Sequence, residues 1–265
     1  MDSYEKPIPV VDWPSNAGSY SAVPVNLEDP RSSDPLVRIN DFAIAGESYY
    51  FRHDRKNWPY NTKIDGSLQH AWCRRLVAQK LKQVNEFLNT EGVELYIWDA
   101  YRPIQCQVGL WNFFIALALT EMPDATESER MNFVLDYISD PTRFQVGDST
   151  TWPTHITGAA VDLTLRDLHT RQLCKMGARF DEPSKMSHSD YYERRLLENP
   201  TREIEEICRN RRLLHFAMKQ EGFVNYPKEF WHFDWGNQMY VHNLRLLSGE
   251  APNAAWFGYI ESPES

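Results

Sequence analysis

The sequence predicts an α+β fold. Two observations support this prediction: the spacing of the apolar residues, and the order of the helices and strands that this spacing indicates. Apolar residues recur every three or four positions in some segments and alternate in others, in the order helix, strand, helix, then strand, helix, strand. Such an order is typical of α+β proteins. The chain has 265 residues, which is enough for one sizeable core. We therefore expect a single domain over 37–265, preceded by an arm over 1–36.

The first 36 residues are expected to form an extended arm. They contain six of the 16 prolines of the chain and show little periodicity. Proline lacks the N–H that a helix interior needs and clashes with the preceding turn, so this density of prolines forbids a long helix. We predict that the arm lies on the surface of the domain. Short apolar clusters between 37 and 52 then favour one or two strands.

The clearest helix and strand patterns follow one another in the next part of the chain. Apolar residues recur at three- and four-residue spacing over 68–90, and Gly92 marks the end of the predicted helix. Residues 93–98 alternate, with Val93, Leu95 and Ile97 on one side and Glu94, Tyr96 and Trp98 on the other. This alternation predicts a strand with one face on the core.

The rest of the domain is predicted from similar patterns. Polar residues over 140–153 indicate a loop, and Asn199-Pro200 and Gly222 are typical of the two ends of a helix. The remaining elements are helices over 104–120, 128–138 and 199–220, and strands over 158–165 and 229–235.

Charge and composition exclude several classes of function. The formal net charge is −9, from 37 acidic and 28 basic residues, which disfavours generic binding to nucleic acid or to an anionic membrane. No apolar run approaches the roughly 20 residues that cross a bilayer, and the first residues lack the features of a secretion signal. The spacing of the cysteines fits neither a zinc knuckle nor a redox motif. We expect reduced thiols in a cytoplasmic protein. The cysteines are Cys73, Cys106, Cys174 and Cys208.

Two short motifs supply the residue types of a catalytic metal site. They are His155-Ile-Thr-Gly-Ala-Ala-Val-Asp162 and Glu229-Phe-Trp-His232. A catalytic zinc ion needs three nitrogen or oxygen ligands and an open position for water, and His155, Asp162 and His232 would supply that set. Zinc lowers the pKa of its water to about 7, and Glu229 is the candidate to take the water's proton and pass it to a leaving amine. We expect one zinc ion per chain.

The spacing within each motif sets a geometric condition. His155 and Asp162 are seven positions apart, so a continuous strand would point them to opposite faces. They converge only if the chain turns between them, and Gly158 is placed to allow that turn. Glu229 and His232 are three apart, so we expect Glu229 to lie just before the last strand.

Each motif also has a structural interpretation. A histidine before a turn, such as His155, is more often a surface or capping residue. Glu229 and His232 lie among aromatic residues and are equally consistent with a polar pair in the core. For Asp162 the functional interpretation is favoured, because burying a carboxylate in an apolar strand is costly unless it is paired or binds a metal.

Arg102 is a further candidate for the site. It follows the predicted strand 93–98 and precedes a proline, where a helix should not yet have begun. A guanidinium aimed into the site would stabilise the oxyanion of a tetrahedral intermediate. An ion pair with Asp99 is an equally good interpretation.

Several motifs together resemble one family of zinc peptidases. In order and spacing they are similar to the D-alanyl-D-alanine dipeptidases of the VanX type, within a clan that includes lysostaphin-like enzymes and the hedgehog fold. The resemblance implies a small antiparallel sheet that carries the zinc site, with helices packed on its outer face. The matching segments are Ile97-Trp-Asp-Ala-Tyr-Arg-Pro103, His155-x-x-Gly-x-Ala-x-Asp-Leu-Thr-Leu165, Met176-Gly-Ala-Arg-Phe-Asp181, Ser187-His188, Asn210-Arg-Arg-Leu-Leu214 and Glu229-Phe-Trp-His-Phe233.

The resemblance also implies roles for individual residues. Glu229 corresponds to the catalytic base, Arg102 to the residue that stabilises the transition state, and Asp181 to a residue that binds the free amino group of the substrate. The implied zinc ligands are His155, Asp162 and His232.

The chain departs from this family at Pro153. The family has a serine there that contacts the substrate, whereas proline offers neither a hydroxyl nor an N–H; Thr154 lies beside it. Extra residues in the arm, around 53–67 and around 189–202 lie at loops, where insertions often reshape the mouth of a site. We expect a dipeptide substrate, D-Ala-D-Ala or a related one. A modified amino acid or specialised metabolite is the second candidate, and a non-catalytic metal-binding module is the third.

Overall fold

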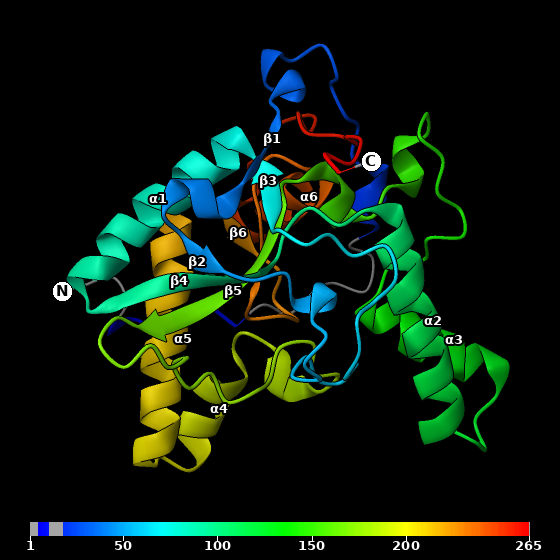
Figure 1. Cartoon of the computed structure of the whole chain (residues 1–265). Coiled ribbons are helices and arrows are strands. Elements are labelled where there is room, and N and C mark those ends of the chain that lie inside the picture. Colours follow the sequence, from blue (N-terminus) through cyan, green and yellow to red (C-terminus); the bar gives the residue numbers. More distant parts are fainter. Residues whose placement is uncertain (1–4, 11–17, 265) are drawn as a thin grey trace.

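The structure is a computed structural model, which describes residues 5–10 and 18–264. It has the α+β architecture expected from the sequence (Figure 1). The helices are α1 (Arg75–Thr90), α2 (Ile104–Glu121), α3 (Glu127–Tyr137), α4 (Tyr191–Glu198), α5 (Arg202–Gln220) and α6 (Gln238–Ser248). The strands are β1 (Leu36–Arg38), β2 (Ala45–Gly46), β3 (Trp72–Arg74), β4 (Val93–Asp99), β5 (Ala160–Asp167), β6 (Val224–Asn225) and β7 (His232–Asp234).

A five-stranded sheet lies at the centre of the domain. Its strand order is β2-β4-β5-β7-β6, and neighbouring strands are antiparallel except for the parallel pair β2–β4. The expected small antiparallel sheet is therefore confirmed, with one parallel edge strand added. That strand approaches closely at Gly46, where a Cβ would lie 2.7 Å from the Cβ of Ile97. β1 and β3 form a separate antiparallel pair.

Helices cover one face of the central sheet. α1 packs on β4 and α5, and α5 packs on β5 (Figure 1). Val161, Leu163 and Leu165 of β5 are fully buried in the main apolar core. Because successive side chains of a strand point to opposite faces, Asp162 lies on the other face. The α2–α3 pair projects from the side of the domain (Figure 1).

The helix predicted over 68–90 begins later than expected. Residues 72–74 pair with β1 as strand β3, and the helix α1 begins directly after them. The carboxylate of Asp34 accepts a hydrogen bond from the N–H of Leu76 at 2.8 Å. A side chain from the preceding segment thus satisfies a free N–H at the helix start, which a local N-cap residue normally does.

Other boundaries also differ from the sequence prediction. The helix predicted over 199–220 begins at Arg202, because Thr201 is the N-cap and accepts from the N–H of Ile204. The strand predicted over 229–235 is limited to β7. Neither α4 nor α6 is predicted from the sequence. No helix within the described residues is both long and apolar enough to cross a membrane.

The strand predicted over 93–98 is buried on both faces, not on one. Leu95 and Ile97 face the apolar core, and on the opposite face Trp98 stacks on Phe180 with ring centroids 4.7 Å apart. The loop that contains Phe180 therefore covers the side of the strand that alternation alone leaves open to solvent.

The described part of the arm packs against the domain. Val25 forms a parallel bridge with Ala255. Gln238, the first residue of α6, donates from Nε2 to the carbonyl of Val23 at 2.8 Å. Val23 is buried, so the arm is held on the domain by both backbone pairing and apolar contact.

Candidate metal centre and active site

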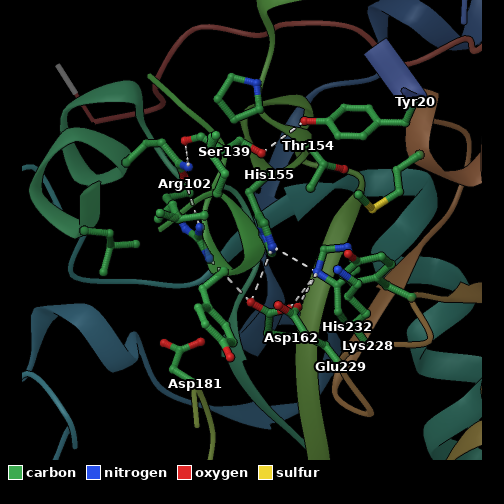
Figure 2. Close-up of a pocket in the computed structure, with 18 of the residues that line it drawn as sticks. Tyr20, Arg102, Ser139, Thr154, His155, Asp162, Asp181, Lys228, Glu229 and His232 are labelled. Carbon is green, nitrogen blue, oxygen red and sulfur yellow. Dashed lines mark hydrogen bonds and ion pairs between the residues drawn. The ribbon is translucent and has the colours of Figure 1, made fainter. Parts of the chain in front are cut away.

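The structure brings His155, Asp162 and His232 together (Figure 2). His155 Nε2 lies 3.4 Å from Asp162 Oδ2 and 3.3 Å from His232 Nδ1. His232 Nδ1 lies 3.0 Å from Asp162 Oδ1. All three side chains are buried, and together they form a compact set of nitrogen and oxygen donors.

Two local features of the chain cause this convergence. A 3-10 turn over Thr154–Thr157 ends at Gly158, whose φ is 66°. A Cβ at Gly158 would lie 2.5 Å from Cδ2 of Leu36, so glycine suits this position both for its conformation and for its lack of a side chain. The turn expected between His155 and Asp162 is therefore present. Across the sheet, the register of β5 and β7 pairs Asp162 directly with His232.

The donor set fits one zinc ion. A tetrahedral zinc site with ligands at about 2.0–2.1 Å places its donor atoms roughly 3.3 Å apart, close to the three distances above. His155 Nδ1 lies 2.7 Å from the carbonyl of Ala100, and His232 Nε2 lies 3.0 Å from Asp234 Oδ2. Each ring thus presents its other nitrogen to the centre, held by an outer partner as is usual for metal-binding histidines. The expected cofactor, zinc, agrees with this geometry.

Burial and nearby carboxylates shift the pKa values of the two imidazoles in opposite directions. Burial lowers the pKa of His155 to about 3, so this imidazole is neutral at pH 7 and available as a ligand. Although burial opposes it, the carboxylates of Asp234 and Asp162 hold the pKa of His232 well above its usual value. Metal binding at Nδ1 would compete with a proton at that nitrogen.

Asp234 is a part of the site that the sequence prediction missed. It is fully buried and accepts hydrogen bonds from Thr154 Oγ1 at 3.0 Å and Asn237 Nδ2 at 2.6 Å, besides its contact with His232. The available signal was spacing, because residues two apart on a strand share a face. Thr154, expected near the substrate, lines the cavity but donates its hydroxyl proton to Asp234.

Arg102 pairs with Asp99 and also lines the cavity. It is buried, and its Nε donates to Asp99 Oδ2 at 2.8 Å, so the ion pair with Asp99 is present. Its Nη1 donates to Gln107 Oε1 at 3.0 Å, and its Nη2 lies 3.5 Å from Asp162 Oδ2. The guanidinium is therefore fixed in place beside the metal ligands, where it can donate to an oxygen of the substrate.

Glu229 lies just before β7, as its spacing from His232 predicts. Its Oε2 is 3.8 Å from His232 Nδ1, and about a fifth of its side chain is exposed to the cavity, 21%. Burial raises the pKa of Glu229 to about 8, with the charges of Asp162 and Asp181 acting in the same direction. A bound cation would lower that pKa and bring the carboxyl into the range suited to accepting and returning a proton.

Asp181 lies on the opposite side of the cavity from Thr154. Its Oδ2 accepts hydrogen bonds from the hydroxyls of Tyr50 at 2.8 Å and Tyr60 at 2.9 Å. Burial raises the pKa of Asp181 to about 7, and the negative charge of Asp162 adds to this effect. The two tyrosines were missed from the sequence; Tyr60 lies in the segment 53–67, which thus contributes to the wall of the cavity.

All eight residues singled out from the sequence line one cavity of about 440 Å³. Tyr20 of the arm and Ser139 also line it (Figure 2), and so does Asn243 of α6. Three donor residues that fit zinc, with the partly buried carboxyl of Glu229 and the guanidinium of Arg102 beside them, are the arrangement of a mononuclear zinc hydrolase. The eight residues are Arg102, Pro153, Thr154, His155, Asp162, Asp181, Glu229 and His232.

The sequence model of the D-ala-D-ala dipeptidase family matches residues 68–246, and the chain belongs to that family. A D-alanyl-D-alanine dipeptidase of Synechocystis sp. is 26% identical over 265 residues, 98% of this chain and 100% of the relative. One from Escherichia coli is 37% identical over 143 residues, 54% of this chain and 55% of the relative. One from Enterococcus faecium is 30% identical over 169 residues, 63% of this chain and 74% of the relative.

Proposed function

We propose that this protein hydrolyses the amide bond of D-alanyl-D-alanine or a closely related dipeptide, with one zinc ion bound by His155, Asp162 and His232. The observation that supports the proposal is that the three metal donors line one cavity together with two further carboxyls, Glu229 and Asp181. Membership of the dipeptidase family, and relatives named D-alanyl-D-alanine dipeptidase, support the same reaction.

Each group has a defined task in this reaction. When bound, zinc supplies a water of lowered pKa and polarises the scissile carbonyl. Glu229 takes the proton of the attacking water and transfers it to the leaving nitrogen. Arg102 donates N–H bonds to the oxygen that gains negative charge. Asp181 accepts hydrogen bonds from the ammonium group of the substrate, and Tyr50 and Tyr60 fix its orientation.

The replacement Glu229→Gln tests this mechanism. The amide keeps the shape of the side chain but accepts no proton, so we expect unchanged zinc content and a loss of turnover of at least about a thousandfold. Metal analysis and assays with D-Ala-D-Ala measure the two effects. The exposed Glu86 on α1 provides a matched control as Glu86→Gln. Full activity of Glu229→Gln would contradict the mechanism.

A second substrate class is favoured by one observation. Pro153 lines the cavity but offers no hydroxyl or N–H to a substrate, which leaves room for a modified amino acid or specialised metabolite with an amide bond. A panel of D,D-, L,L-, D,L- and acylated dipeptides separates the two. A non-catalytic metal-binding role is disfavoured, because a structural site needs neither Glu229 nor Arg102.

For the location of the protein we propose the cytoplasm, on the basis of the reduced thiols predicted from the sequence; cell fractionation tests it.

A further inference from the structure

The substrate cavity has two ends that differ in chemistry. Asp181, with the hydroxyls of Tyr50 and Tyr60, lies at one end. Tyr20 and Ser139 lie beyond the metal donors on the opposite side (Figure 2). The first end suits an ammonium group. The second end presents the hydroxyls of Tyr20 and Ser139, and α6, which carries Asn243, packs on the turn Tyr20–Ala22.

The N-terminal arm is part of the second end. Residues 18–20 line the cavity, and the Tyr20 hydroxyl lies 3.2 Å from Ser139 Oγ. Gln238 of α6 donates to the carbonyls of Ser21 at 3.2 Å and Val23 at 2.8 Å. The arm next to Tyr20 is therefore fixed by hydrogen bonds, and the Tyr20 hydroxyl occupies a defined position in the cavity wall.

The hydroxyl pair has a proton to give to a ligand. Tyr20 and Ser139 carry one O–H each, and their mutual hydrogen bond uses one of the two protons. The other acceptor near Tyr20, the carbonyl of Trp152, is 3.5 Å away, beyond the usual range of an O–H···O bond. Thr154 is not a comparable donor, because its proton goes to Asp234.

Asn243 on α6 is an independent indication of a ligand. It lines the same cavity and is only 2% exposed, yet its Nδ2 has no hydrogen-bond partner among the residues that the structure describes. A buried amide without a partner is costly to the folded protein. A polar atom of the substrate would satisfy this group.

We propose that Tyr20, Ser139 and Asn243 bind the free carboxylate of the dipeptide, so that the N-terminal arm forms the carboxyl-end subsite. The inference rests on the proposed function. With the ammonium group at Asp181 and the scissile carbonyl beside the metal donors, the carboxylate of a dipeptide must extend toward the other end of the cavity. Hydrogen bonds to a charged acceptor are stronger than those between neutral groups, so three neutral donors are sufficient to hold it.

The test compares D-Ala-D-Ala with its C-terminal amide, which lacks the negative charge. Binding of both is measured by calorimetry on the zinc-loaded Glu229→Gln protein, alone and with Tyr20→Phe, Ser139→Ala or Asn243→Leu added. We expect each added change to raise the Kd of the free acid about tenfold and that of the amide less than about threefold. In the active protein, the same changes raise KM for the free acid and leave kcat within about twofold.

A matched control separates binding from folding. Tyr240→Phe removes a hydroxyl from the same helix as Asn243, at a residue that packs on Trp256 and is not among those that line the cavity; both Kd values should stay unchanged. Asn243→Leu removes an unpaired buried donor, so its melting temperature should equal or exceed that of the parent protein.

The results are distinguishable from a failure of the proposed function. If the wild-type protein hydrolyses no dipeptide of the panel, the proposed function is wrong, and this inference is wrong with it. If the wild type is active but the three changes leave Kd unaltered, only the inference is overturned. Equal losses for the free acid and the amide also overturn it, because the three donors would then hold something other than the carboxylate.

Discussion

The two faces of strand β5 bury opposite kinds of side chain. On the face toward α1 and α5, Val161, Leu163 and Leu165 are fully buried in the apolar core. On the face toward the cavity, Asp162 is 2% exposed and lies within hydrogen-bonding distance of His232. Neighbouring residues of one strand therefore have different roles: those on one face form the apolar core, and Asp162 on the other face lies in the candidate metal site.

The difference between the two faces separates the residues that stabilise the fold from those that form the site. Burial of apolar side chains stabilises the fold by about 25 cal/mol per Å² of area removed from water. Buried charges cost free energy unless they are paired. Burial alone would raise the pKa of Asp162, but His155, His232 and Arg102 together hold it below its usual value. The cavity face is thus stabilised by mutual pairing, and a metal ion would complete that pairing.

The largest expected effect is on the cavity face, at Asp162. Asp162→Asn keeps the shape of the side chain but removes its charge. We expect zinc affinity and turnover to fall by about a thousandfold, more than the 10–100-fold typical of outer-shell partners. Metal analysis after dialysis and a dipeptidase assay measure this. Asp41→Asn, at an exposed position, is the control and should retain both properties; stoichiometric zinc in Asp162→Asn would refute the ligand assignment.

The next effect is on the apolar face, at Leu163. Leu163→Ala leaves a cavity in a fully buried position, so the free energy of unfolding should fall by about 2–5 kcal/mol. Zinc content per folded molecule should stay the same, because the side chain points away from the metal donors. Urea denaturation and metal analysis check both statements. Leu197→Ala, at a position 88% exposed, should change stability by less than about 0.5 kcal/mol.

A smaller effect is expected at Asp234, which contacts the metal donor His232 without being a donor itself. Asp234→Asn weakens the hydrogen bond that orients His232, which should lower zinc affinity by about 10–100-fold. Competition with a chromogenic chelator measures the affinity. Asp41→Asn serves again as the control. An unaltered zinc affinity would show that the contact of Asp234 with His232 is not needed to orient the ring.

The sequence predicted the cavity face better than its surroundings. His155, Asp162, Glu229 and His232 were identified because two short motifs contain the residue types of a catalytic zinc site, and the spacing within each motif predicted where the chain must turn. These constraints are local, since they depend on strand periodicity and on the conformation of a glycine. The resemblance to one family then added residues distant along the chain.

The residues that were missed depend on contacts between distant segments. Tyr50 and Tyr60 meet Asp181 across more than a hundred positions of the chain, and Tyr20 reaches Ser139 from the arm. Nothing in the local pattern of an aromatic residue says which carboxylate it will meet. The helix start at Arg75 was missed for the same reason, because the group that caps it, Asp34, lies outside the helix.

The smallest expected effect concerns His215, a residue with a buried polar atom on the helix that packs on the apolar face of the sheet. His215 of α5 has a buried Nδ1 that finds no hydrogen-bond partner within residues 5–10 and 18–264, and burial lowers its pKa to about 4. The unfolded chain, with a pKa near 6.5, binds the proton more tightly, so this group removes stability as pH falls from about 6.5 toward 4. Between pH 7 and 5.5 we expect it to account for about 1 kcal/mol. Urea unfolding of His215→Phe at the two pH values should show a difference smaller by that amount, whereas His169→Phe, at an exposed position, should behave as the wild type. If the free energy of unfolding of His215→Phe changes between the two pH values as much as that of the wild type, His215 is not the source of the pH dependence. The loss of stability at low pH then comes from the charged groups of the cavity face, and only that face responds to pH.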